Sequence, residues 1–386
     1  MRKYFVAMVL IISFFCAIFS PASAASRDED PSIPLCPPGI YTGWEVDCAP
    51  LGPIQYMTDI AKEIGIFFPP APLPIFNPDP SLSEIDYQYA YVFKDRAPIY
   101  ATLDAAVNNN KDSIVQRIPP GFNYVSYTDV GVSQGRYFFR TDKGWISSDY
   151  VTPGTTPYFQ GLEFSHTPEK PFGWALNYFS AQQKVALKST PGFQKDDYTG
   201  RFLEHLELVQ IYETVEIDDW LWYRISPEEW VFQTAIAKVT PNTTPPAGLN
   251  INRWIELNLY EQTISVYENG ELVFVTLVAT GTAPTWTYPG LFQIYDKLET
   301  TRMRGGTQAE DNAYYLENVP WTMYFDDKRA LHGAYWRPML GFPQSHGCVN
   351  LSVGDSHWLY EWADVGDWIY IWDPSGRTPL EEEDLR

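Results

Sequence analysis

Residues 253–277 read RWIELNLYEQTISVYENGELVFVTL. The first part of this stretch alternates, so that Trp254 and Glu256 share one face of a strand while apolar side chains occupy the other face. Further along, Asn269-Gly270 separates two strand-like runs, and this dipeptide favours the tight turn of a β-hairpin. The stretch therefore predicts a strand followed by a β-hairpin.

The composition favours the same fold class over the whole chain. Of the 386 residues, 16% are aromatic, and there are 32 Pro and 25 Gly. Aromatic side chains fit strands, whereas Pro and Gly favour turns, so many short strands are expected rather than long helices. A chain of this length predicts two or three domains.

The charge excludes two classes of partner. Acidic residues number 48 against 27 basic ones, which gives a formal net charge of −21. Nucleic acids and anionic membrane surfaces are bound by basic patches. We therefore expect no nucleic-acid partner.

The N-terminus has the pattern of a signal peptide. Arg2 and Lys3 precede an apolar run over residues 4–19, and Pro21-Ala22-Ser23-Ala24 resembles a cleavage site. Residues 1–24 are therefore predicted to direct export; an uncleaved anchor is the alternative. No later stretch is long and apolar enough for a spanning helix, so no membrane span is expected after cleavage.

Export changes how the cysteines are interpreted. Cys36 and Cys48 lie close together in the sequence and would pair in an oxidising compartment, with two free thiols as the alternative. Cys348 is then the unpaired thiol. Such a thiol in a secreted chain is either reactive or a partner for another molecule.

Changes in composition divide the chain into seven segments. They are the signal peptide (1–24), a Pro-rich segment with the probable disulfide (25–84), a first small β domain (85–152), a second small β domain (153–240), a Pro/Gly linker (241–249), a C-terminal domain (250–373) and an acidic tail (374–386). One helix is expected in the C-terminal domain, over residues 354–364, with Ser352 as its N-cap. His357 on this helix is expected to face solvent.

The reactive side chains gather near the C-terminus. His332 and His346 flank Cys348, and an imidazole close to a thiol can take its proton and create a nucleophile. Gly347 leaves room for a substrate backbone, and the amides around it are suited to face an oxyanion. Two alternatives remain open from the residues alone: a buried structural cysteine, and a zinc site formed by His332, His346 and Cys348.

Both upstream β domains resemble bacterial SH3-like domains. The first carries Gly144-Trp145-Ile146 and Tyr150-Val151, and the second matches loosely at residues 230–232. Their aromatic side chains either contact glycan or peptide of a cell wall or fill small β cores.

The C-terminal domain resembles the L,D-transpeptidase catalytic domain, also called YkuD. The resemblance rests on His332-Gly333 followed by the run from Ser345 to Asn350, SHGCVN, and is supported by residues 254–272, 287–292 and 366–369. It implies a β-sandwich catalytic domain preceded by two SH3-like barrels in a mainly β chain. It also implies a peptidoglycan enzyme that needs neither metal nor organic cofactor.

The resemblance assigns a role to each matching residue. Cys348 would be the nucleophile, His332 its base, and the Gly333 carbonyl would orient that imidazole. The oxyanion and substrate-binding positions would be Ser345, His346, Gly347 and Asn350.

The implied reaction takes place outside the cytoplasm, in the periplasm or the cell wall. Members of the family cleave the bond between an L-centre and D-Ala in a tetrapeptide stem, hold the acyl group as a thioester, and transfer it to an amine of a neighbouring stem as a 3→3 cross-link. Two alternatives differ from this expectation: an L,D-carboxypeptidase that uses water, and a non-catalytic wall-binding module.

Overall fold

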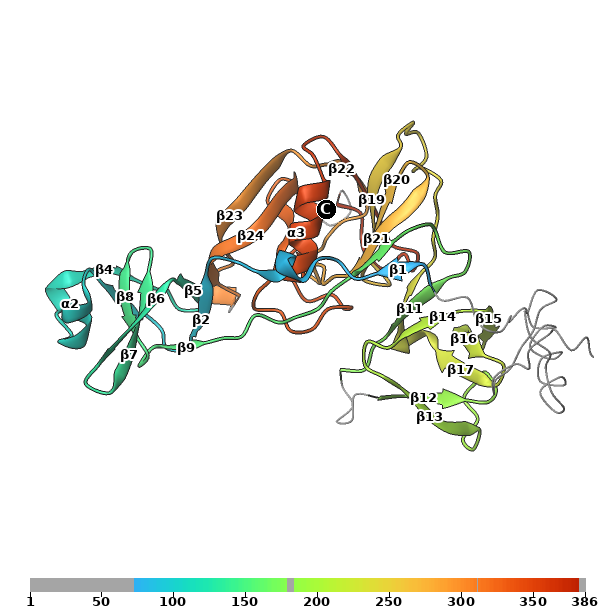
Figure 1. Cartoon of the computed structure of the whole chain (residues 1–386), viewed down its shortest axis with the longest axis horizontal. Coiled ribbons are helices and arrows are strands. Elements are labelled where there is room, and N and C mark those ends of the chain that lie inside the picture. The colour runs from blue at the N-terminus through green and yellow to red at the C-terminus, as the bar shows by residue number, and fades with distance from the viewer. Residues whose placement is uncertain (1–72, 179–183, 311, 382–386) are drawn as a thin grey trace, which may run out of the picture. The chain divides into compact units, whose positions relative to one another are not determined.

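The computed structural model describes residues 73–178, 184–310 and 312–381. Short strands dominate this part of the chain (Figure 1), so the prediction of a mainly β fold is confirmed. The predicted signal peptide and the Cys36–Cys48 disulfide lie outside the described residues. No helix in the described part is long and apolar enough to cross a membrane.

The opening stretch of the sequence analysis forms the centre of a large sheet, here called the hairpin sheet. Its strand order is β1 (Ile75–Phe76), β10 (Leu162–Phe164), β21 (Glu271–Leu277), β20 (Thr263–Glu268), β19 (Arg253–Asn258), β27 (Trp368–Trp372) and β22 (Gly290–Gln293). The β20–β21 turn places Asn269 and Gly270 at φ 53° and 81°, which is the left-handed geometry that a tight hairpin turn requires. The predicted strand and hairpin are confirmed.

A second large sheet, the site sheet, contains the reactive motifs. Its order is β26 (Val349–Leu351), β25 (Arg329–Gly333), β24 (Tyr314–Asp326), β5 (Phe122–Tyr127), β2 (Gln88–Val92) and β9 (Val151–Pro153), and β23 (Asp296–Gly305) also pairs with β24. The β24–β5 junction is parallel, with Tyr314 opposite Phe122. The sheet thus joins C-terminal strands to strands from far upstream.

One apolar core joins the two sheets and the helix. The inward residues of the hairpin sheet include Ile255 and Phe274, and those of the site sheet include Met323 and Val349; all are fully buried. Leu359 of α3 (Val353–Trp362) belongs to the same core. The predicted helix is confirmed, and the Ser352 side chain accepts a hydrogen bond from the Asp355 amide, as a cap should.

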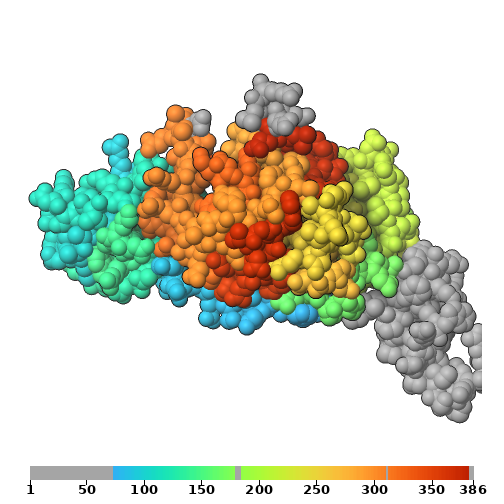
Figure 2. Space-filling view, turned by 90° about the horizontal axis from the view of Figure 1, so that it is seen from above, coloured from blue at the N-terminus to red at the C-terminus, as the bar shows by residue number. Residues whose placement is uncertain are grey.

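The helix does not expose His357 as expected. The His357 ring stacks on Trp321 with centroids 3.7 Å apart, and its Nδ1 lies 3.0 Å from the Leu82 carbonyl oxygen. The segment around η1 (Pro80–Ser83), blue in Figures 1 and 2, runs beside the red helix and covers this face. The prediction of a solvated histidine was wrong because a distant segment packs over it.

A buried carboxylate fastens the same helix to the hairpin sheet. Asp355 is inaccessible to solvent and accepts hydrogen bonds from the Gly161 amide (2.8 Å) and the Thr276 hydroxyl (2.6 Å). Burial raises the pKa of Asp355 to about 6, although these donors oppose the shift.

The first β-unit, residues 88–153, divides its strands between two sheets. Its own sheet has the order β4 (Ile114–Arg117), β3 (Pro98–Tyr100), β8 (Gly144–Ser147), β7 (Arg136–Thr141) and β6 (Asp129–Ser133). The short helix α2 (Leu103–Val107) packs beside it, while β2, β5 and β9 belong to the site sheet. An SH3-like barrel is not confirmed for this unit.

The second β-unit, residues 172–239, forms two sheets of its own. One has the order β14 (Leu208–Gln210), β11 (Phe172–Ala175) and β18 (Ile236–Val239). The other has the order β13 (Tyr198–Glu204), β12 (Lys184–Lys188), β17 (Glu229–Phe232), β16 (Trp220–Ser226) and β15 (Glu213–Ile217). Here too an SH3-like barrel is not confirmed.

Candidate active site

Five of the seven predicted site residues line one cavity of about 440 Å³, whereas Gly333 and Gly347 are not among its lining residues. Cys348 and His332 both line it, together with Ser345, His346 and Asn350. The β23–β24 hairpin, the first β-unit and the loop between β25 and β26 supply further walls. These additional lining residues are Tyr91, Gly121, Phe122, Met303, Asn312, Ala313, Tyr314, Leu316, Trp336, Arg337 and Gln344.

Cys348 lies immediately before β26, in no disulfide and partly exposed. Its Sγ is 3.8 Å from the Lys328 carbonyl oxygen. Burial of the sulfur raises the pKa of the thiol, and the Ala330 amide and the Arg329 charge oppose this rise only in part. The resting residue is therefore a protonated thiol at neutral pH.

His332 lies on β25, directly opposite Asn350 on β26, and is 1% exposed. Its Nδ1 lies 3.4 Å from the Gly333 carbonyl oxygen, so this carbonyl favours the tautomer with hydrogen on Nδ1. Burial lowers the pKa of His332 to about 4; the Gly333 carbonyl opposes the shift, and the Arg337 charge adds to it. The imidazole is therefore neutral at neutral pH and can act as a base.

Asn350 contacts both the His332 imidazole and the cationic side chain of Arg337. Its Nδ2 is 3.2 Å from His332 Nε2, and its Oδ1 accepts a hydrogen bond from Arg337 Nε at 3.3 Å. Among the described residues no hydrogen bond joins Cys348 Sγ to an imidazole nitrogen. Proton transfer from the thiol thus requires His332 Nε2 to exchange its amide partner for the sulfur or for a bridging water.

A tight turn presents the thiol. Ser345 Oγ donates to the Cys348 carbonyl oxygen at 2.5 Å and accepts from the Gly347 amide at 3.1 Å. Gly347 has φ 107°, which favours glycine, and a Cβ there would make a tight contact 3.2 Å from Arg329 Nε. Since the Gly347 amide already donates to Ser345, it is not available to an oxyanion in this conformation.

His346 stands apart from the proposed base. It is exposed at the cavity wall, with its ring 5.3 Å from that of Tyr314. Desolvation lowers its pKa, and the nearby Arg337 charge lowers it further. This position suits contact with a ligand rather than activation of the thiol.

Sequence reasoning missed Arg337 and Gln344, as well as the aromatic wall from the first β-unit. Arg337 and Gln344 lie between the two motifs, where no pattern marks them. Tyr91 and Phe122 reach the cavity only because β5 pairs with β24, and the local sequence carries no signal for that pairing.

The described residues contain no group of three or more His, Cys, Asp or Glu side chains placed to hold a metal ion. The zinc alternative to a cysteine nucleophile therefore finds no ligand set in this part of the chain.

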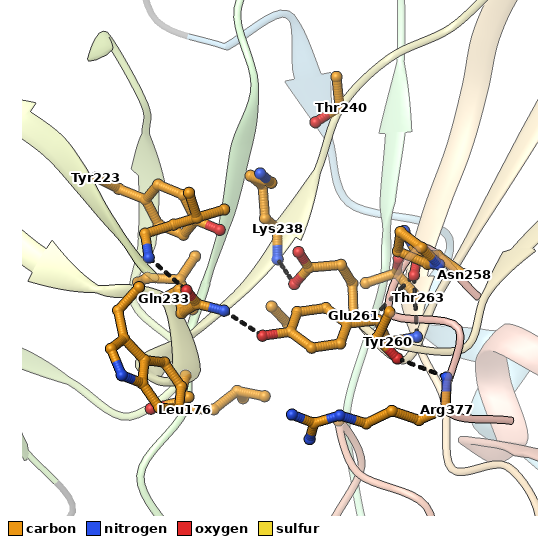
Figure 3. Close-up of a pocket in the computed structure, with 18 of the residues that line it drawn as sticks. Leu176, Tyr223, Gln233, Lys238, Thr240, Asn258, Tyr260, Glu261, Thr263 and Arg377 are labelled. Atoms are coloured by element: carbon orange, nitrogen blue, oxygen red, sulfur yellow. Dashed lines mark hydrogen bonds between the residues drawn. The ribbon is translucent and has the colours of Figure 1, made fainter. Parts of the chain in front are cut away.

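A larger cavity of about 1080 Å³ lies between the second β-unit and the hairpin sheet (Figure 3). Glu261 projects toward it and accepts a hydrogen bond from the Lys238 amide at 2.8 Å, while Glu256 accepts one from the Trp372 indole at 3.1 Å. Burial raises the pKa of each carboxyl to about 7. No cysteine or histidine lines this cavity, so it offers no nucleophile and base of the kind found around Cys348.

Comparison with known proteins agrees with the resemblance in the sequence. Residues 252–371 match the family model of the YkuD L,D-transpeptidase catalytic domain. No curated protein matches the chain.

Several solved structures are similar over part of the chain. An L,D-transpeptidase from Stackebrandtia nassauensis is 30% identical over 34% of this chain and 58% of that one, with a TM-score of 0.26. The catalytic domain of the E. faecium L,D-transpeptidase is 24% identical over 32% of this chain and 100% of that one, with a TM-score of 0.29. An L,D-transpeptidase from Mycobacterium smegmatis is 17% identical over 56% of this chain and 92% of that one, with a TM-score of 0.30. The chain thus spans little more than half the length of the Stackebrandtia protein.

Proposed function

We propose that this protein is a cysteine L,D-transpeptidase that remodels peptidoglycan. The observation that carries the proposal is the placement of Cys348 and His332 at one cavity within residues 252–371, which match the L,D-transpeptidase catalytic domain. A thiol, a neutral buried imidazole and a tight turn are the parts that acyl transfer through a thioester needs.

The proposed acylation begins with proton transfer from Cys348 Sγ to His332 Nε2. The sulfur attacks the carbonyl carbon of the bond between the L-centre and D-Ala, and a tetrahedral oxyanion forms. When it collapses, the C–N bond breaks, His332 returns the proton to the leaving amine, and D-Ala departs. The acyl group remains on Cys348 as a thioester.

An amine from a second stem peptide then attacks the thioester. His332 accepts a proton from this amine and delivers it to the departing sulfur, so a new amide forms and the thiol is regenerated. This gives a 3→3 cross-link. Water in place of the amine would give a tripeptide, and the enzyme would then be an L,D-carboxypeptidase.

Incubation with tetrapeptide muropeptides, followed by intact-mass measurement, tests the nucleophile. We expect an adduct equal to the donor minus D-Ala on the wild-type chain and none on Cys348→Ala, which replaces one small side chain by another. The products separate the two acceptors, because cross-linked dimers indicate transpeptidation and tripeptides indicate hydrolysis. An adduct on Cys348→Ala would contradict the proposal, and absence of reaction in wild type would favour a wall-binding role.

His332→Ala tests the base. Loss of a general base slows the acylation step by about 10²–10⁴-fold. His205→Ala is the matched control, since His205 lies in the second β-unit and its Nδ1 accepts only a structural hydrogen bond from the Asn177 amide. Equal acylation rates in wild type and His332→Ala would remove His332 from the mechanism.

We propose that the protein acts in the periplasm or the cell wall, where this substrate lies, and the predicted signal peptide over residues 1–24 supports that location. The mass of the mature chain, isolated from its native envelope, would report cleavage after Ala24. Contact of the two β-units with glycan stays part of the proposal and is tested by binding to purified wall fragments.

A further inference from the structure

Arg337 is a partly buried cation at the wall of the active-site cavity, and neutral groups hold it in place. Its Nε donates to Asn350 Oδ1 at 3.3 Å. Its two terminal nitrogens donate to the Gln344 side-chain oxygen at 2.8 Å and to the Gln344 carbonyl oxygen at 3.2 Å. The Gln344 amide is itself oriented, because its Nε2 donates to the Met339 carbonyl oxygen at 2.7 Å.

No carboxylate within the described ranges forms an ion pair with Arg337. The neighbouring cation Arg329 differs, since it pairs with both Asp326 and Glu381. Desolvation lowers the pKa of Arg337 to about 10, and removing a positive charge even in part from water is costly without a counter-charge. In a chain of net charge −21, acidic partners are plentiful, yet none of the described ones has been placed here.

The geometry of the guanidinium indicates what would complete it. A guanidinium has five N–H donors, and the three hydrogen bonds above use one on each nitrogen. One donor therefore remains on each terminal nitrogen. A carboxylate can accept one hydrogen bond from each of these two N–H groups, one on each of its oxygens, and so form a bidentate pair with the guanidinium.

We propose that Arg337 binds a carboxylate of the donor peptide and so fixes the donor beside Cys348. The inference rests on the proposed function for the identity of the donor, whose leaving residue carries a terminal carboxylate one residue beyond the scissile carbonyl. Gln344 and Asn350 orient the guanidinium. Because Asn350 also contacts His332, donor binding and the orientation of the base are linked.

Turnover of paired donors tests the contact. The donors are a tetrapeptide stem with a free C-terminal carboxylate and the same peptide with a C-terminal amide. Arg337→Gln should lower kcat/KM for the acid about ten- to a hundredfold, mostly through KM, because a charge-assisted pair is lost. Arg337→Lys should restore part of the loss, while Arg140→Gln, which removes an exposed charge in the first β-unit, should change nothing.

The amide donor identifies which carboxylate is bound. If Arg337→Gln impairs the acid but not the amide, the terminal carboxylate is the ligand. If it impairs both donors equally and Arg337→Lys restores both, a carboxylate earlier in the peptide is the ligand. Equal impairment with no rescue by Lys indicates a merely structural arginine and overturns the inference.

Equilibrium binding to Cys348→Ala separates this inference from the proposed function. The same two peptides are titrated into Cys348→Ala and into the double variant that also carries Arg337→Gln. An Arg337-dependent preference for the acid supports the anchor even if the wild-type chain never releases D-Ala, in which case only the proposed function fails. Binding that is unaffected by Arg337→Gln, or no binding of either peptide, overturns the anchor even where the wild-type chain turns over.

Discussion

The two β-units attach to the C-terminal part of the chain in different ways. The first joins edge to edge, through backbone pairing of β5 with β24, and a hydrogen bond from the Ser126 amide to the Glu317 carboxylate (3.2 Å) reinforces the junction. The second packs face to face, through a shared apolar cluster that includes Trp174 of the unit and Trp254 of the hairpin sheet. Among the described residues of the two units, those of the edge-to-edge unit alone line the cavity that contains Cys348.

This difference shows that a small β domain can contribute in two ways, by positioning side chains at a cavity or by burying apolar area. Edge pairing fixes a neighbouring strand in register, so the first β-unit can hold Tyr91 and Phe122 at a defined place in the cavity that Cys348 lines. Face packing buries apolar area without such register, so the second β-unit contributes stability. Changes in the first unit should therefore affect substrate use, and changes in the second should affect unfolding.

The largest expected effect is on the face-to-face junction. Trp174 is 3% exposed in the shared core, and Trp174→Ala should lower the free energy of unfolding by about 3–5 kcal/mol. Chemical denaturation measures this change, and the acylation rate of the folded fraction should be unaltered. Trp220→Ala in the same unit is the control, because Trp220 is 40% exposed. A large loss of acylation rate in folded Trp174→Ala would erase the distinction between the units.

The buried carboxyl of Glu261, between the second β-unit and the hairpin sheet, predicts that the free energy of unfolding depends on pH. The pKa of Glu261 is about 7 in the folded chain and near 4.5 in the unfolded one, so the folded state holds the extra proton between these values. Rising pH across this window therefore lowers the free energy of unfolding, and Glu261→Gln should remove that loss.

We expect Glu261→Gln to be more stable than wild type by about 3 kcal/mol at pH 8 and nearly equal to it at pH 4. Denaturation at both pH values measures the difference. Glu216→Gln, an exposed change at the same cavity, should show no such dependence. Equal stability of Glu261→Gln and wild type at pH 8 would contradict a raised pKa of Glu261 in the folded chain.

A smaller effect is expected at the edge-to-edge unit, and it should appear in substrate use. Phe122 is 43% exposed and lines the active-site cavity, so Phe122→Ala should raise KM about three- to tenfold, a loss of about 1 kcal/mol of stacking or apolar contact. Its unfolding free energy should barely change. Tyr137→Ala removes another exposed ring of the same unit, away from that cavity, and should leave KM unaltered. A KM unchanged by Phe122→Ala would reduce the first unit to a structural role.

The smallest effect concerns the base. Because burial lowers the pKa of His332 to about 4, the acid limb of kcat/KM should lie near pH 4 rather than near 6.5. Arg337 contributes to this lowering less than burial does, so Arg337→Gln should move the limb upward by less than about one pH unit. This shift in the pH profile should be measured with the donor peptide that has a C-terminal amide, because that peptide lacks the terminal carboxylate that Arg337 is proposed to bind. An acid limb near 6.5 in the wild-type chain would mean that His332 is not the group that titrates.

Local patterns in the sequence were sufficient for the hairpin at Asn269-Gly270 and for the helix capped by Ser352. Both depend on side-chain alternation, turn chemistry and capping within a few residues. The site motifs were also visible, because His332 and Cys348 lie on or next to neighbouring parallel strands, close in sequence.

Long-range packing was not visible. His357 was misjudged because the segment near Leu82 covers it, and Arg337 was missed because its partners emerge only when the loop between the motifs folds. Pairing of β5 with β24 joins strands that no local pattern relates. The predicted domain boundary near residue 152 likewise followed composition, which does not show that β2, β5 and β9 contribute to the site sheet.

The edge-to-edge junction also determines when, during folding, the cavity that contains Cys348 is complete. Tyr89 donates a hydrogen bond to the Asn318 carbonyl oxygen across 229 positions, and the cavity has no complete wall until such distant segments meet. Closing so long a loop is slow compared with forming hairpins and helices. Until it closes, the cavity beside Cys348 lacks the aromatic wall that Tyr91 and Phe122 supply. The proposed acyl transfer would then report completed folding of both regions, because a chain arrested before this step would lack that wall.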